Sequence, residues 1–379
     1  MLIGIDCRLP TYRMGGISQY ILHLLPALAA IDDKNQFIVY QSRREERDFV
    51  PEDAARWRRR NLWTPCHHRL ERYTLAAEMA RDGLAVLHSP DFIPPATGHT
   101  RRVITIHDLN FLHFPELLTD ESRRYYAGQI KWAVATADAI AADSYATRRD
   151  VMELLGVAPE KVKAIHLAAN PLYTQAPEPA QVARTLKHLG LPEGFLLSVG
   201  TLEPRKNLPM LVRIYARLRR EHGIKVPLVL VGRKGWLYEE IFAAIEQYGL
   251  SQNVVHIEGA TDEVLRNLYH AASALLTPSL YEGFGLPALE AQHSGCAAIV
   301  SDRGSLPEIV GSDGLILPLE DEDAWVNTTW LVLMDKEFAA QAVEVGYTQC
   351  RQFSWTKTAQ STLALYTGRQ PVSPPSSPL

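Results

Sequence analysis

Two glutamates flank a glycine-containing turn in the stretch SLYEGFGLPALEAQHSG, which runs from Ser279 to Gly295. A short apolar pattern typical of a strand precedes the turn, and an apolar helix pattern begins around Pro287, a residue suited to the first turn of a helix. Backbone N–H groups at a helix start, aided by the helix dipole, bind phosphate. The N–H groups of Gly285 and Leu286 are therefore predicted to face a diphosphate.

The glutamates of this stretch are predicted to contact hydroxyl groups rather than phosphate. Glu290 lies about one turn into the helix pattern, where it would accept hydrogen bonds from both hydroxyls of a ribose. Glu282 precedes the turn and would reach past the phosphates to the hydroxyls of a sugar. The alternative is that both are solvated glutamates beside a tight turn.

Two further stretches offer groups for a phosphate site. GTLEPRKN follows a predicted strand and carries Arg205 and Lys206. Fixed cations stabilise the negative charge that develops on a leaving diphosphate, although adjacent cations at a helix start are also ordinary surface charges. YRMGGISQY places Gly15 and Gly16 just before the first helix pattern, as a second turn that a ligand could approach closely.

His107 and an acidic triplet are weaker signals. His107, in TIHDLNF, ends a predicted strand and could bind a sugar hydroxyl or the reacting centre, or serve the fold alone. The triplet Asp321–Asp323 has the D-x-D shape of a metal–diphosphate site. Acids in the first turn of a helix explain the triplet more simply, and the histidines are scattered. We therefore expect no metal and no cofactor.

The same turn could also be the dinucleotide-binding motif of an NAD-dependent dehydrogenase. GFGLPA, from Gly283 to Ala288, matches the dinucleotide fingerprint G-x-G-x-x-A. Asp302 follows Gly283 by 19 residues, which suits a ribose-binding acid. Against this, the residues LYE separate the predicted strand from the first glycine, and the motif does not follow the first strand of its domain.

Short apolar runs alternate with helix patterns in two halves of the chain, which predicts two Rossmann-like α/β domains around a ligand cleft. The expected organisation is an N-terminal domain, a linker, a C-terminal nucleotide-sugar-binding domain, a C-terminal helix and a disordered tail. The corresponding ranges are 1–170, 171–190, 191–352, 353–369 and 370–379. Ser354 is the expected N-cap of the C-terminal helix.

Composition narrows the class of protein further. The chain has 379 residues, 46% of them hydrophobic, with a net charge of −4 that disfavours a nucleic-acid binder. The four cysteines form no CxxC pair, and no apolar run is long enough to span a membrane, so a cytoplasmic location is expected. The stretch Arg56–Arg72 holds six arginines against one glutamate, which indicates either a solvated face or a patch for anionic lipid.

Together these stretches resemble family 4 of the retaining glycosyltransferases, which have the GT-B fold. The resemblance covers nearly the whole chain. It depends on GGISQY, HDL, GTLEPRKN, EGFGLPALE and SDRGSLPEIVG in the family's order, and the spacing of Glu282 and Glu290 is its most specific element. It implies two Rossmann-like domains that face each other across a cleft, with the N-terminal domain on the acceptor side and the C-terminal helix returning to it.

The resemblance also implies roles for individual residues. Arg205 and Lys206 would hold the donor diphosphate, Glu290 the ribose and Glu282 the donor sugar. Backbone amides would come from Phe284, Gly285 and Leu286, and His107 would lie at the reaction centre with Gly16 near the phosphate. Many members carry an arginine where this chain has Thr201, and Arg205 is expected to replace it.

GTLEPRKN is most similar to bacterial mannosyl- and rhamnosyltransferases of surface polysaccharide assembly. A GDP-sugar is therefore the first expected donor and a UDP-sugar the second. The expected acceptor is a lipid-linked oligosaccharide, and the protein would contact the inner face of the membrane peripherally. A subunit that binds nucleotide-sugar without catalysis is a third alternative, which the combination of Glu282, Lys206 and His107 disfavours.

Overall fold

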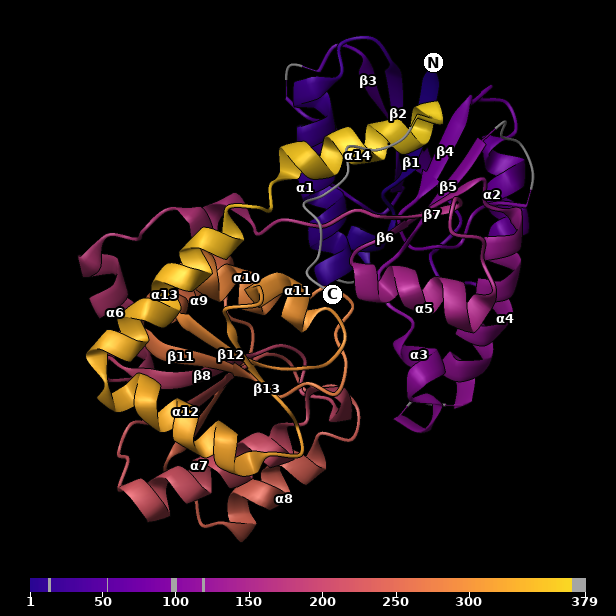
Figure 1. The fold of residues 1–379 in the computed structure, drawn as a ribbon. Helices are drawn as coiled ribbons and strands as arrows, with labels where there is room; N and C mark the ends of the chain where they lie inside the picture. Colours follow the sequence, from indigo (N-terminus) through magenta and orange to yellow (C-terminus); the bar gives the residue numbers. More distant parts are fainter. Residues whose placement is uncertain (13–14, 53, 97–100, 118–119, 370–379) are drawn as a thin grey trace. The chain divides into compact units, whose positions relative to one another are not determined.

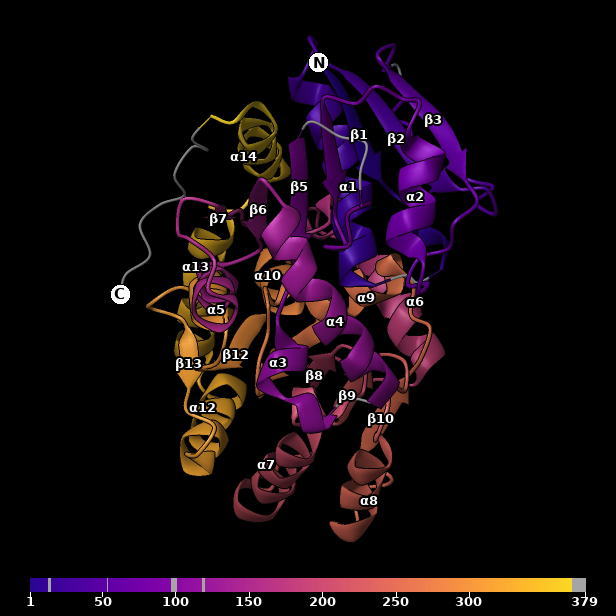
Figure 2. The same cartoon turned by 90° about the vertical axis from the view of Figure 1, so that its right-hand side faces the viewer.

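The computed structural model describes residues 1–12, 15–52, 54–96, 101–117 and 120–369, and the predicted disordered tail lies outside these ranges. The chain forms two compact units (Figures 1 and 2). Unit 1 contains residues 1–168 together with the segment from Phe353 onward, and unit 2 contains residues 169–352. Both are built on a parallel sheet with helices.

Unit 1 has a sheet of seven strands within the described residues, in the order β3-β2-β1-β4-β5-β6-β7. All pairs are parallel, and Ile5 of β1 lies between Val39 of β2 and His88 of β4. The strands are β1 Leu2–Asp6, β2 Gln36–Ser42, β3 Trp57–Leu62, β4 Val86–Ser89, β5 Arg101–Ile106, β6 Ala139–Ala142 and β7 Val162–Ala164. The strand order reverses direction between β1 and β4, which is where ligands bind in such sheets.

The helices of unit 1 come from both ends of the chain. They are α1 Gly16–Ile31, α2 Glu71–Met79, α3 Asn110–His113, α4 Asp120–Thr136, α5 Tyr145–Leu155 and α14 Trp355–Thr367, with short 3-10 turns at Leu9–Thr11 and Pro115–Leu117. Helix α14 packs beside α1 (Figure 1). Ser354 caps α14 by accepting a hydrogen bond from the Lys357 N–H, which confirms the predicted N-cap.

Helix α14 is also bonded to the centre of the unit 1 sheet. The Tyr366 hydroxyl contacts Nδ1 of His88 at 2.7 Å, and Nε2 of His88 contacts Oγ1 of Thr105 at 2.8 Å. His88 is fully buried, and burial lowers its pKa to about 3, so the ring is neutral. A neutral imidazole between two hydroxyls is fully satisfied, because each hydroxyl can donate or accept.

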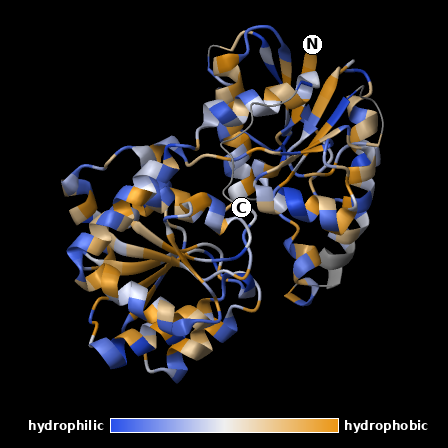
Figure 3. Ribbon diagram, viewed as in Figure 1, coloured by the Kyte–Doolittle hydropathy of each residue, from blue (hydrophilic) through white to orange (hydrophobic). Residues whose placement is uncertain are grey.

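Unit 2 has six strands within the described residues, in the order β10-β9-β8-β11-β12-β13. They are β8 Phe195–Val199, β9 Leu228–Val231, β10 Val254–Ile257, β11 Ala272–Thr277, β12 Ala297–Ser301 and β13 Leu315–Leu317. Figure 3 shows that the strands are largely hydrophobic, as buried parallel strands are. The order again reverses beside the first strand, between β8 and β11.

Helices cover both faces of the unit 2 sheet. In Figure 1, α7, α8 and α12 lie on one side of the strands, and α9, α10 and α13 lie on the other. The helices are α6 Pro179–Leu189, α7 Leu208–His222, α8 Glu239–Gln247, α9 Asp262–Ala271, α10 Leu286–His293, α11 Leu306–Val310, α12 Glu322–Met334 and α13 Lys336–Cys350. Short 3-10 turns span Pro171–Thr174 and Pro204–Lys206. The predicted fold class, two Rossmann-like α/β domains, is confirmed.

Two segments differ from their sequence-based description. The arginine-rich stretch contains an edge strand, β3, which pairs in parallel with β2, and sequence reasoning did not predict it. The segment 171–190, expected as a linker, carries α6, which packs against α9 within unit 2. The amide of Asn267 donates to Oγ1 of Thr185 at 2.8 Å across this contact.

Candidate active site

The predicted site residues of unit 2 lie in the loops that follow two neighbouring strands. Arg205 and Lys206 belong to the 3-10 turn Pro204–Lys206 after β8, and Glu282 lies between β11 and α10. Strands β8 and β11 are paired, and the strand order reverses at this pair. The loops therefore meet at the position where parallel sheets of this order bind their ligands.

The carboxylate of Glu282 accepts three hydrogen bonds, two from the loop after β8 and one from within its own loop. Its Oε1 accepts from Nζ of Lys206 at 2.7 Å and from Oγ of Ser279 at 2.6 Å. Its Oε2 accepts from Nη1 of Arg205 at 2.7 Å. Burial raises the pKa of Glu282, but Arg205, Lys206 and Ser279 together lower it to about 2, so the group is ionised at every physiological pH.

Arg205 is held by a second carboxylate. Its Nη2 and Nε donate to Oε1 of Glu203 at 2.7 and 3.1 Å, and its Nη1 also donates to the Tyr281 carbonyl at 2.7 Å. The Arg205, Lys206 and Glu282 side chains are 13%, 11% and 8% exposed. Two cations and two carboxylates thus form a nearly buried group with no net charge, which is the arrangement that buried charges require.

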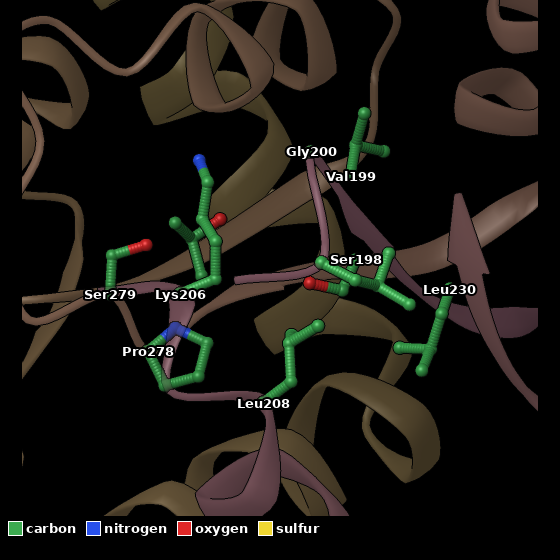
Figure 4. A pocket seen from close by; sticks show the side chains of 10 residues that line it. Ser198, Val199, Gly200, Lys206, Leu208, Leu230, Pro278 and Ser279 are labelled. Carbon is green, nitrogen blue, oxygen red and sulfur yellow. The ribbon is translucent and has the colours of Figure 1, made fainter. Parts of the chain in front are cut away.

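Lys206 reaches Glu282 by crossing the end of β8 at Gly200. A Cβ on Gly200 would lie 2.9 Å from Cε of Lys206, and Gly200 has a φ of 142°, so a side chain at this position would block the lysine. A small pocket lies beside it, and Figure 4 shows its lining side chains, among them Lys206 and Ser279. The pocket connects the ends of β8 and β11.

The end of β12 and the loop after it hold the backbone of the Glu282 turn through serine hydroxyls. Oγ of Ser305 donates to the carbonyls of Glu282 and Phe284 at 3.0 and 2.7 Å, and Oγ of Ser301 donates to the Ser279 carbonyl at 2.6 Å. A Cβ on Gly304 would lie 2.4 Å from the Glu282 carbonyl oxygen. The stretch SDRGSLPEIVG therefore has a structural role in positioning the turn.

Helix α10 begins directly after this turn. Gly285 is its N-cap with a φ of 97°, Leu286 is the first helical residue and Phe284 is buried. The first N–H groups of a helix have no acceptor within the helix, so the amides at Gly285 and Leu286 are oriented for an anion. The structure thus places the predicted amides at the N-terminus of α10, directly after the turn that carries Glu282. Their role toward a ligand stays a prediction.

Glu290 lies on α10 in a different environment. Its Oε2 accepts a hydrogen bond from the Tyr269 hydroxyl at 2.9 Å. Burial raises the pKa of Glu290 to about 7; the Tyr269 hydroxyl opposes this shift, and the charge of Asp262 adds to it. The two glutamates of the motif therefore differ in charge state near neutral pH, with Glu282 ionised and Glu290 near its midpoint.

The remaining predicted residues lie in unit 1. Gly15 and Gly16 begin α1, and His107 follows β5. Nδ1 of His107 lies 2.6 Å from Oδ2 of Asp143, and Nε2 lies 2.8 Å from the Pro90 carbonyl oxygen. Because both partners are acceptors, both ring nitrogens carry a proton, and no lone pair is left to act as a base in this arrangement.

The electrostatic environment of His107 agrees with that geometry. Burial lowers its pKa, but the charge and hydrogen bond of Asp143, with a smaller contribution from Asp91, raise it more, so the net shift is upward. The hydrogen bonds of His107, which follows β5, connect it to Pro90 after β4 and to Asp143 after β6. Its predicted contact with a sugar hydroxyl would require one of its two hydrogen bonds to open.

Sequence reasoning missed three residues that complete the unit 2 site. Glu203 holds Arg205, Ser279 holds Glu282, and Ser305 holds the backbone of the turn. The first was visible as a carboxylate two residues before Arg205, and the second as a serine three residues before Glu282. Ser305 had no local signal, since it lies 23 residues from Glu282 in the sequence.

The acidic triplet has structural partners. Asp321 caps α12 by accepting from the Ala324 N–H at 2.9 Å, and Asp323 pairs with Nη2 of Arg217 at 2.6 Å. Within the part of the chain that the structure describes, no group of three His, Cys, Asp or Glu side chains could hold a metal ion.

Comparison with protein families defines the class. A glycosyltransferase family 4 model matches residues 14–171, and a model of glycosyl transferases group 1 matches residues 187–349. The chain is 31% identical to the O-antigen chain mannosyltransferase B of Escherichia coli over 282 residues, 74% of each protein. The fold and the site define a glycosyltransferase with the GT-B fold. The chain belongs to glycosyltransferase family 4.

A further relative supports the family assignment, and two solved structures share the fold. The serotype-specific mannosyltransferase WbdA of Escherichia coli is 31% identical over 280 residues, and the chain spans about one third of its length, 34%. Sucrose-phosphate synthase from Thermosynechococcus elongatus has a TM-score of 0.75 at 22% identity, covering 97% of this chain and 98% of that one. WaaG, a glycosyltransferase involved in lipopolysaccharide biosynthesis, has a TM-score of 0.73 at 16% identity, covering 97% and 100%.

The family assignment excludes the dehydrogenase, and the fold gives the reason. GFGLPA follows β11, the fourth strand of unit 2, whereas a dinucleotide fingerprint follows the first. Asp302 pairs with Arg303 at 3.1 Å.

As for a membrane-spanning segment, none of the described helices has both the length and the hydropathy to cross a bilayer.

Replacing Lys206 by alanine should lower turnover by roughly two orders of magnitude, because a preorganised cation at the leaving group is lost. The variant should still fold, because Glu282 keeps its hydrogen bonds from Arg205 and Ser279, but with a lower free energy of unfolding, because a nearly buried cation is lost. Lys234→Ala, which removes an exposed lysine from the loop after β9, is the matched control and should keep normal turnover. Near-normal turnover in Lys206→Ala would remove Lys206 from the mechanism.

If Glu290 binds the ribose of a nucleotide-sugar as predicted, the affinity for a probe such as GDP-mannose should rise with pH through about 7, the pKa of Glu290, because only the ionised carboxyl can accept from both ribose hydroxyls. Isothermal titration between pH 5.5 and 8.5 measures this, since the diphosphate of GDP-mannose does not titrate in that range. Asp262→Asn should move the midpoint to lower pH, because the charge of Asp262 raises the pKa of Glu290. A pH-independent affinity in the wild type would separate Glu290 from the ribose.

Proposed function

We propose that this protein is a retaining mannosyltransferase that moves mannose from GDP-mannose to a lipid-linked saccharide during assembly of a lipopolysaccharide or exopolysaccharide. The observation that carries the proposal is the 31% identity to an O-antigen chain mannosyltransferase over 74% of both chains. A second mannosyltransferase, WbdA, is equally similar. Mannose is therefore preferred to rhamnose as the transferred sugar.

The chemistry follows from the charges of unit 2. An acceptor hydroxyl oxygen bonds to the anomeric carbon as the bond from that carbon to the diphosphate breaks. The departing diphosphate gains negative charge, which Arg205, Lys206 and the amides at the start of α10 would stabilise. The acceptor proton passes to the departing phosphate oxygen. Attack from the leaving-group side retains the α configuration, and no metal is needed.

UDP-sugars are the second candidate donors. HepE of Anabaena, which has been solved in complex with UDP-glucose, has a TM-score of 0.73 at 16% identity, covering 97% of this chain and 100% of that one. Its likeness to this chain covers the fold, so the base of the donor is left to experiment. Thermal-shift measurements with GDP, UDP and ADP separate the candidates, because a ligand at ~100 times its Kd stabilises by about 2.7 kcal/mol.

The transfer assay tests the reaction itself. Incubation with GDP-mannose and a lipid-linked saccharide in excess EDTA should give an α-linked mannosyl product, identified by NMR of the new linkage. A β-linked product from the α-linked donor would overturn the retaining mechanism. A strict requirement for Mg²⁺ or Mn²⁺ would bring Asp321 and Asp323 back as metal ligands.

A lipid-linked acceptor suggests a contact with anionic membrane through unit 1. Trp63, Leu70 and Tyr73 are 69%, 55% and 54% exposed. They lie in or next to the arginine-rich stretch, where Arg58 and Arg69 are also exposed. Exposed aromatic side chains beside basic ones are typical of proteins that bind the lipid headgroup region.

The protein should pellet with anionic vesicles at low salt and be released at high salt, because salt screens the arginines. Trp63→Ala should weaken this binding, whereas Met334→Ala, which removes an exposed side chain from unit 2, should not. Equal recovery with neutral and anionic vesicles would leave the arginine-rich stretch as a solvated surface.

A further inference from the structure

The sheet of unit 1 has its own reversal point, the position where the strand order changes direction. The reaction proposed above uses no residue beside it. The strand order of unit 1 reverses between β1 and β4, as the order of unit 2 reverses between β8 and β11. In unit 2 the loops after those two strands carry Lys206 and Glu282. The corresponding loops of unit 1 begin at Cys7 and Pro90, and a dense set of polar side chains lies there.

The set is built around Arg8, whose side chain is 1% exposed. Its Nη2 pairs with Oδ2 of Asp6 at 2.7 Å and with Oε1 of Glu71 at 2.6 Å. The other oxygen of Glu71 accepts from the His67 N–H at 2.8 Å and from the Tyr125 hydroxyl at 3.1 Å. Four elements, β1, the loop after β3, α2 and α4, thus converge on one buried ion pair.

The solvent-facing part of the set is a carboxylate–histidine pair. Nε2 of His67 lies 2.6 Å from Oδ2 of Asp91, and their side chains are 33% and 19% exposed. Arg8 and Glu71, at 1% and 3%, lie beneath them. Asp91 directly follows Pro90, whose carbonyl is held by His107. The buried groups therefore support a reachable pair.

The backbone at this point is strained. Among the described residues, the non-glycine residues with a left-handed φ are His67 at 60°, Phe92 at 33°, Asn207 and Leu237. Histidine and asparagine adopt this conformation more readily than most residues, whereas a phenylalanine at positive φ, such as Phe92, is a true outlier of the kind that gathers at ligand sites. His67 and Phe92 both adjoin Asp91, and Asn207 adjoins Lys206 in the donor site. Three of the four thus lie at the two reversal points.

The charges at this position disfavour an anionic ligand. Even with His67 protonated, the carboxyl groups of Asp6, Glu71 and Asp91 outnumber the cations of Arg8 and His67. The site in unit 2 differs, because its cations and carboxylates are equal in number and the amides at the start of α10 lie beside them. Carboxylates accept hydrogen bonds from hydroxyl groups instead. The chemistry fits a neutral ligand rich in hydroxyls.

Aromatic rings and an unpaired hydroxyl support the same ligand. The rings of Tyr125 and Tyr126 lie 5.8 and 6.0 Å from that of His67, and Phe92 lies 6.1 Å from Tyr126. Such rings pack against the apolar face of a sugar. Oγ of Ser89, a residue 2% exposed at the end of β4, has no hydrogen-bond partner among the described residues. A buried polar atom of this kind is normally satisfied.

We infer that Asp91 and His67, with the rings of Tyr125 and Tyr126, form the subsite that binds the sugar hydroxyls of the acceptor. The inference rests on the proposed function, since an acceptor is needed only if the protein transfers a sugar. Asp91 and His67 touch the acceptor sugar. Arg8, Glu71 and His107 are positioning residues, because they hold the loops that carry this pair.

Saturation-transfer NMR on the full chain tests this binding directly. Methyl α-D-mannopyranoside and methyl N-acetyl-α-D-glucosaminide are the probes, added after the donor site has been filled with GDP. The wild type should transfer saturation to at least one probe. Asp91→Asn should weaken the binding about tenfold, because a charged acceptor is replaced by a neutral amide. Glu153→Gln, an exposed carboxylate on α5, is the matched control and should bind normally.

Lys206→Ala should keep the probe binding, because the lysine belongs to the donor site. In the transfer assay, Asp91→Asn should raise the KM for the acceptor about tenfold and leave the KM for the donor unchanged. Tyr126→Leu, which removes a ring and no charge, should also weaken probe binding. Absence of binding to both probes, or equal binding in Asp91→Asn and wild type, overturns the subsite. Loss of transfer from every nucleotide-sugar, with probe binding intact, overturns the proposed function instead.

Discussion

The Glu282 carboxylate must be neutralised where it is buried, and the architecture of the donor site follows from that constraint. Two cations and a serine surround it, so its pKa falls to about 2 despite the burial. Arg205 and Lys206 come from the loop after β8, while Glu282 comes from the loop after β11, and the ion pairs fix one loop against the other. Removing one partner from such a group would leave a buried charge without full compensation, which is strongly destabilising. The two cations are therefore held in fixed positions by the protein itself, and electrostatic stabilisation of a leaving group requires such preorganised charges.

Two histidines of unit 1 illustrate how partners, and not burial alone, decide charge. His88 lies between two hydroxyls and stays neutral, because burial lowers its pKa to about 3. His107 lies between a carboxylate and a carbonyl, and both ring nitrogens must donate. The first joins a helix to a sheet without adding charge. The second holds the ends of three strands together through a charged hydrogen bond, which is the stronger kind.

The regular parts of the fold were predictable, because buried parallel strands are apolar runs and each predicted run became a strand. β3 was missed because it is an edge strand with the sequence WRRRNL, so it carries charge where the others carry apolar side chains. In the candidate site, the turn with Glu282, the helix with Glu290 and the loop with Arg205 and Lys206 were predicted from local sequence patterns. The ion pair between Glu282 and Lys206 spans 76 residues of sequence, and only the parallel pairing of β8 and β11 brings its ends together. Sequence patterns therefore located the groups, while topology decided their partners.

The position of α14 has a consequence for how the chain is made in the cell. Tyr366 completes the hydrogen bonds of His88 at the centre of the unit 1 sheet, although 278 residues separate them. Unit 2 is continuous from residue 169 to 352, so all of it is synthesised before α14. Domains fold as units and usually begin during synthesis. Of the two units, unit 1 is thus started first and completed last, and the surface of α1 that binds α14 lacks its partner until that helix has been synthesised.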